Sequence, residues 1–152
     1  MSDMNELLRK QIALTMEETI NGLTEGASFA GTGTMMLVDK LSAAEASAPA
    51  SGLCIAAHVE HMAYGMDAFA AAMAGDTSLF DNWPPMDPLS LSEEEWKEIR
   101  IALKSKTEAF MKRVNSTDFD QSALRLAMGN VAHAVYHLGI IQVKFDVLKG
   151  ND

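Results

Sequence analysis

Two histidines, His133 and His137, lie four residues apart in an apolar stretch near the C-terminal end of the sequence, VAHAVYHLGIIQ at residues 131–142. In a helix these two imidazoles lie on the same face, one turn apart, close enough to bind one ion. Most neighbouring side chains are valine, alanine, leucine or isoleucine, which cannot hydrogen-bond a buried imidazole. Because imidazole nitrogens are common ligands of divalent metals, the spacing indicates half of a metal site.

The other two of the four histidines form a second close pair, His58 and His61, in a stretch that also contains Cys54. Cys54, His58 and His61 are spaced by four and three residues, so they share one side of a helix. A single histidine of this kind is more often a core or surface residue, but two such pairs favour a metal site between facing helices. Three histidines leave an open position for water or substrate, whereas four would close the site. Cys54 is interpreted as a small core residue.

The elements that must position these residues are four long amphipathic segments. Their apolar residues recur at steps of three and four, the period of a helix with one buried face. We expect these helices at residues 3–23, 53–75, 92–114 and about 121–148. Ser92 and Glu95 form a capping box at the start of the third, and Gly75 ends the second. Gly129 and Gly139 interrupt the fourth, where a glycine usually allows another helix or a ligand to come close.

Three connections join the long helices. Residues 25–33 are small and glycine-rich and predict a loop. Residues 34–40 are short and apolar and are interpreted as a helix, because no second strand exists to pair with them. The capping box of Ser42 and Glu45 predicts a single further turn. Residues 76–91 hold three of the four prolines and predict a long irregular connection.

Composition indicates one globular domain, residues 1–152, with 48% hydrophobic and 22% charged residues. The net charge of −9 argues against binding to nucleic acid or to an anionic membrane surface. One cysteine, no signal-like N-terminus and no apolar run of about 18 residues together predict a cytoplasmic protein without a membrane span. The predicted fold is all-α, a four-helix bundle with a short extra helix and a long proline-rich loop.

Four motifs carry a resemblance to a known family: LSAAEASAPASG, HVEHMAYGMDAFAAAMAG, SEEEWKEIRIAL and VAHAVYHLGIIQ. In this order along nearly the whole chain they resemble the DinB-like (damage-inducible) superfamily of helical bundles. The resemblance implies one ligand histidine on the second long helix and two on the last. His133 and His137 match the last pair, and His61 fits the first position best, about four turns before Gly75. His58 is either a neighbouring group one turn away or the alternative ligand.

The resemblance also implies a function. It suggests a divalent metal, zinc or nickel, and a small-molecule substrate such as a low-molecular-weight thiol, since similar proteins include bacillithiol- and mycothiol-dependent transferases and isomerases. It further suggests a homodimer. The residues themselves indicate only an ion site. They do not specifically support hydrolysis by a carboxylate-assisted water, because Glu60, Asp67 and Asp146 are all badly spaced to serve as a general base beside the histidines.

A rival hypothesis is a non-catalytic helical module for stress-related binding or dimerisation, with a structural or vestigial metal site. It predicts that replacing His61 or His137 lowers the melting temperature without changing any activity. The two hypotheses share the same fold and the same histidines, and they differ only in whether the site performs chemistry.

Overall fold

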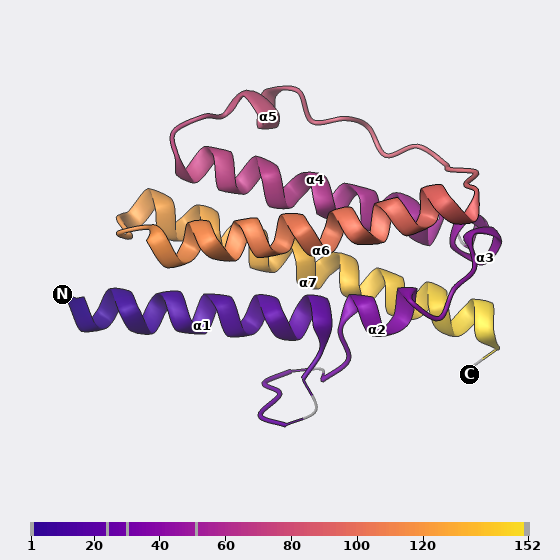
Figure 1. Cartoon of the computed structure of the whole chain (residues 1–152), viewed down its shortest axis with the longest axis horizontal. Helices are drawn as coiled ribbons and strands as arrows, with labels where there is room; N and C mark the ends of the chain where they lie inside the picture. Colours follow the sequence, from indigo (N-terminus) through magenta and orange to yellow (C-terminus); the bar gives the residue numbers. More distant parts are fainter. Residues whose placement is uncertain (1, 24, 30, 51, 151–152) are drawn as a thin grey trace.

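The computed structural model describes residues 2–23, 25–29, 31–50 and 52–150, and within these ranges all regular structure is helical. Four long helices pack into a bundle that runs along the longest axis of the molecule (Figure 1). They are α1 (Ser2–Asn21), α4 (Ile55–Met73), α6 (Glu93–Ser116) and α7 (Gln121–Lys149). The prediction of an all-α fold with four long packed helices is confirmed.

Three short helices lie in the connections: α2 (Thr34–Val38), α3 (Ala43–Ser47) and α5 (Ser78–Asp81). The first two were expected from the sequence. The third lies inside the stretch that was expected to be irregular, so the prediction of a loop over residues 76–91 is wrong for these four positions. The segment carrying α5 passes over the outer side of α4 before the chain enters α6 (Figure 1).

The core is formed where α4 packs against α6 and α7 and where α1 closes the opposite side. Trp96 is fully buried and its indole Nε1 donates a hydrogen bond to the carbonyl oxygen of Leu41, at 2.9 Å. This bond ties α6 to the α2–α3 connection. The largest fully buried apolar side chains come from all four long helices: Met16, Ile20, Ile55, Met62, Met66, Trp96, Leu103, Phe110 and Ile141.

Local capping fixes where the helices begin and end. Both predicted capping boxes are present, with Ser42 and Ser92 each accepting from the backbone N–H of a glutamate three residues later. Gly75, at φ 91°, follows the end of α4 in the left-handed region that glycine tolerates. The predicted ends of the long helices differ from the observed ends by at most two residues.

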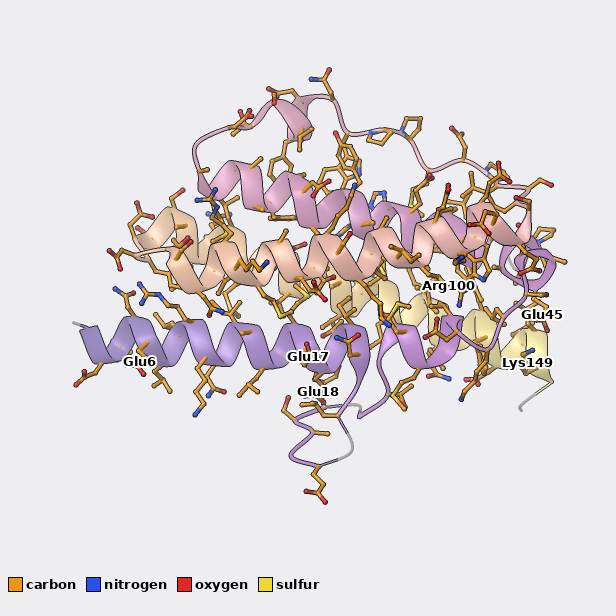
Figure 2. The ribbon with its side chains drawn as sticks, in the orientation of Figure 1. Glu6, Glu17, Glu18, Glu45, Arg100 and Lys149 are labelled. Atoms are coloured by element: carbon orange, nitrogen blue, oxygen red, sulfur yellow. The ribbon has the colours of Figure 1, made fainter. Side chains whose placement is uncertain are left out.

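A salt bridge between Lys149 Nζ and Glu45 Oε1, at 2.5 Å, joins the end of α7 to α3 (Figure 2). The single cysteine, Cys54, is buried at the start of α4, which confirms its interpretation as a core residue. None of the helices among the described residues combines the length and apolar character that crossing a bilayer requires.

Candidate metal centre

The structure brings His61 of α4 together with His133 and His137 of α7. One ring nitrogen from each lies within 4.8 Å of the others, a grouping that could hold a metal ion. The ring centroids are 5.0 Å apart for His61 and His133, 4.8 Å for His61 and His137, and 4.7 Å for His133 and His137. The contact arises because the two α7 histidines are one turn apart on a face that packs against α4. The two distant sequence pairs therefore converge, as the spacing predicted.

Both ring nitrogens of His133 are buried, and neither has a hydrogen-bond partner among the residues that the structure describes. Leaving a buried polar nitrogen unsatisfied costs about 1–3 kcal/mol, so proteins seldom do so without a water, an ion or a ligand to complete the contact. A neutral imidazole offers one lone pair and one N–H. His133 therefore presents an unused lone pair to the space it shares with His61 and His137.

His58 contacts the cluster from one side. Its Nδ1 lies 3.0 Å from Nδ1 of His137, so one of these two nitrogens donates and the other accepts. When His137 donates, its Nε2 carries the lone pair and is free to bind an ion. His58 then orients a ligand without being one. It is absent from the group of three convergent nitrogens, and this geometry favours the interpretation of His58 as a neighbouring group.

Trp83, in the connection between α5 and α6, donates a hydrogen bond from its indole Nε1 to Nδ1 of His61, at 3.2 Å. Its ring centroid lies 5.2 Å from that of His61 and 5.5 Å from that of His133. The rings of Tyr64, Phe69 and Phe80 pack around it. This contact was not predicted, because a tryptophan in a proline-rich segment has no periodic relation to a histidine 22 residues earlier.

Gly65 allows the two helices to approach at the site. A Cβ atom at this position would lie 2.7 Å from Cε1 and 2.8 Å from Nδ1 of His133. Gly65 follows His61 by one turn in the sequence, but the close approach of α7 at this position was not predicted from it. Gly129 behaves as predicted, since a Cβ there would lie 3.1 Å from the Phe69 ring. At Gly139 the prediction of a close neighbour is wrong within the protein, because a Cβ would meet nothing within 4 Å.

Burial keeps the clustered histidines neutral. It lowers the pKa of His137 to about 3, with further lowering by His133, His61 and His58. Burial also lowers the pKa of His58 and of His133 to about 4, and it lowers the pKa of His61. Neutral imidazoles keep the lone pairs that a metal ion requires, so at neutral pH the site needs no deprotonation before it binds one.

A cavity of about 600 Å³ lies beside the histidine cluster, between α4, α6 and the proline-rich connection. His61 and Tyr64 form part of its wall on α4, Ile99 and Glu98 on α6, and Pro84 in the connection. Because His61 belongs to both the cavity wall and the cluster, a small molecule in the cavity would contact one edge of the site. Cavities of this size suit small ligands.

The other polar groups near the site have partners elsewhere. Tyr64 donates from its hydroxyl to the carbonyl oxygen of Leu79, at 2.9 Å, and Tyr136 is 66% exposed with its ring edge-on to His137. The carboxylate of Asp67 pairs with Lys106 at 2.7 Å. Among the described residues, the group that could hold a metal contains three histidines without a carboxylate. Three carboxylates, those of Glu60, Glu95 and Glu98, do line the cavity beside His61.

No protein-family model, no curated protein and no solved structure matches this chain. The structure itself shows a helical bundle with a histidine cluster that could hold a metal ion. The function has to be inferred from the geometry of that cluster and of the cavity beside it.

Proposed function

We propose that this protein is a DinB-like metal-dependent enzyme in which His61, His133 and His137 bind one divalent cation, zinc or nickel, and that it transfers a small thiol to an electrophilic substrate. The observation that carries the proposal is the unpartnered ring of His133, whose two buried nitrogens lack a protein partner beside two further imidazoles. Three neutral nitrogen ligands from a rigid pair of helices match the ligand set of catalytic zinc sites that keep one position open.

The protein groups have separable roles in this proposal. The three imidazoles bind the ion, and His58 fixes the ring of His137 through the 3.0 Å contact of their Nδ1 atoms. Bound there, the ion would lower the pKa of a thiol in its open position, so that the thiolate sulfur displaces a leaving group from carbon while the thiol proton passes to solvent. The cavity beside His61 would hold the substrate against this edge of the site.

Metal content tests the first half of the proposal. Protein purified without a histidine tag and supplied with zinc or nickel should hold one ion per chain, and the His133→Ala variant should lose it. The Tyr136→Phe variant is the matched control, because this exposed ring lies one turn from His133 and contacts His137 without joining the cluster. A wild-type protein that binds no divalent metal would remove the proposal.

Thiol consumption tests the second half. Metal-loaded protein is incubated with cysteine and a chlorinated aromatic electrophile, and the loss of thiol is compared with that of the His133→Ala variant. Metal-dependent loss of thiol supports the enzyme. Tight metal binding with no metal-dependent thiol reaction, and with a lowered melting temperature in His61→Ala, would favour the non-catalytic module instead.

The homodimer suggested by the family resemblance is a separate proposal. Sedimentation equilibrium should give twice the mass of one chain. A single-chain mass at the highest concentrations used for the metal titrations would contradict it.

A further inference from the structure

Trp83 covers the histidine cluster on the side of the connection between α5 and α6. Its ring meets His133 edge-on at 5.5 Å between centroids, and its Cη2 lies 3.5 Å from where a Cβ of Gly65 would be. Its Nε1 bonds to Nδ1 of His61 at 3.2 Å. The indole therefore touches two of the three histidines that would bind the ion, and it does so from outside the helices that carry them.

The hydrogen bond from Trp83 and the ligation of a metal by His61 exclude each other. An indole N–H can only donate, so Nδ1 of His61 must accept, and the ring's proton then lies on Nε2. If the ion binds Nε2, the proton moves to Nδ1, and two N–H groups face each other. If the ion binds Nδ1, the lone pair that accepts from Trp83 is used. Either way the bond to Trp83 breaks.

We propose that Trp83 is the gate residue of this site: its indole N–H occupies the one lone pair of the neutral His61 ring, and ligation by His61 releases the indole. This inference rests on the proposed metal site. It adds a role for the proline-rich connection, which the histidine cluster by itself does not explain.

The release is local on the N-terminal side of Trp83, because the chain there is held by other hydrogen bonds. Tyr64 of α4 donates from its hydroxyl to the carbonyl oxygen of Leu79 in α5, and Asn82 donates from its side chain to the carbonyl oxygen of Ser78. Neither bond involves the indole. The indole can therefore turn away from His61 while α5 stays in place. Pro84 follows directly in the chain and lines the cavity beside His61.

Tryptophan emission reports the gate directly, since the chain has two tryptophans and the other, Trp96, is buried and bonded to Leu41. Zinc is the probe because its filled d shell does not take part in redox chemistry. Zinc is titrated into the metal-free full chain and into Trp83→Phe, and binding is followed in parallel by emission and by calorimetry. Trp96→Phe is the matched control, because it also removes one indole N–H bond, but one remote from the histidines.

The gate predicts that zinc changes the emission of wild type and of Trp96→Phe but not that of Trp83→Phe. It also predicts that Trp83→Phe binds zinc about threefold to tenfold more tightly, because no hydrogen bond has to be broken first. Zinc binding with unchanged wild-type emission, or with equal affinity in Trp83→Phe, would overturn the gate and leave the metal site standing. No zinc bound by either protein would overturn the metal site itself, and the gate with it.

Discussion

Two buried polar clusters of this protein differ in whether the fold satisfies them. Glu18 of α1 is 1% exposed, and its carboxylate accepts from Ser28 through N–H and hydroxyl, at 2.8–3.0 Å, and from the N–H groups of Phe29 and Gly31. It lies where α1 meets the loop that follows it (Figure 2). His133 is also inaccessible at both ring nitrogens but receives nothing from the protein.

The difference separates a structural group from a functional one. The Glu18 carboxylate holds the loop after α1 through several hydrogen bonds, so both of its oxygens already have partners and need no further ligand. The histidines are arranged so that hydrogen-bonding or ligating nitrogens remain unused. The absence of a side chain at Gly65 makes room for the His133 ring in this arrangement. Buried polar groups that a fold leaves incomplete are those that a ligand can complete.

The two clusters should differ most in how their contribution to stability responds to acid. The clustered histidines have pKa values lowered by burial, to about 4 for His58 and His133 and about 3 for His137, against an ordinary value of 6.5. In this window the unfolded chain binds more protons than the folded one, so stability rises with pH. The stabilisation is complete above pH 6.5 and is lost as the pH falls toward 4.

Urea unfolding of the metal-free protein should therefore show a lower free energy of unfolding near pH 5 than near pH 7.5, by about 2 kcal/mol for each histidine whose pKa is lowered to about 4 or below. Replacing both His133 and His137 with phenylalanine should remove about half of this pH dependence, because His58 and His61 keep pKa values lowered by burial. An equal loss on acidification in that double variant would mean that other groups cause it.

Removing Glu18 should cost stability and leave the metal site intact. Glu18→Ala removes the charged acceptor of the hydrogen bonds from Ser28, Phe29 and Gly31, and we expect the free energy of unfolding to fall by about 3 kcal/mol. The matched control is Glu17→Ala, whose half-buried carboxylate accepts only from Asn21 one turn away, with a change under about 0.5 kcal/mol. Zinc affinity should be the same in both variants. A loss of zinc in Glu18→Ala alone would break the separation between the clusters.

Two glycines inside helices make a matched pair. Gly65→Ala should destabilise the protein by about 2 kcal/mol, because the new methyl group collides with the ring of His133. Gly139→Ala should stabilise it by up to about 1 kcal/mol, since a Cβ there meets nothing and alanine favours the helix. Thermal unfolding of both variants measures whether each substitution lowers or raises the stability. Equal effects would show that the α4–α7 approach at His133 is looser than described.

The two histidines of α4 should differ in how much each contributes to zinc affinity. His58→Phe keeps a ring but removes the partner of His137, and zinc affinity should fall about tenfold with one ion still bound. His61→Phe should reduce it more than a hundredfold, because a ligand is lost. The reverse order, measured by calorimetry, would make His58 the ligand.

The sequence predicted what depends on local rules. Helical periodicity identified the four long helices, and serine–glutamate spacing identified both capping boxes, because these signals need only neighbours along the chain. The convergence of the two histidine pairs followed once a bundle was assumed. Long-range contacts were not predictable: α5 is too short to show a period, and the bond from Trp83 to His61 depends on how the connection crosses α4.

Anomalous X-ray scattering from crystals grown with zinc is the most direct measurement of the central claim. The account predicts a single strong peak about 2.0–2.1 Å from one nitrogen each of His61, His133 and His137. The absence of a peak between α4 and α7 would contradict it. A zinc ion bound by other groups, with the His133 ring still unpartnered, would contradict it as well.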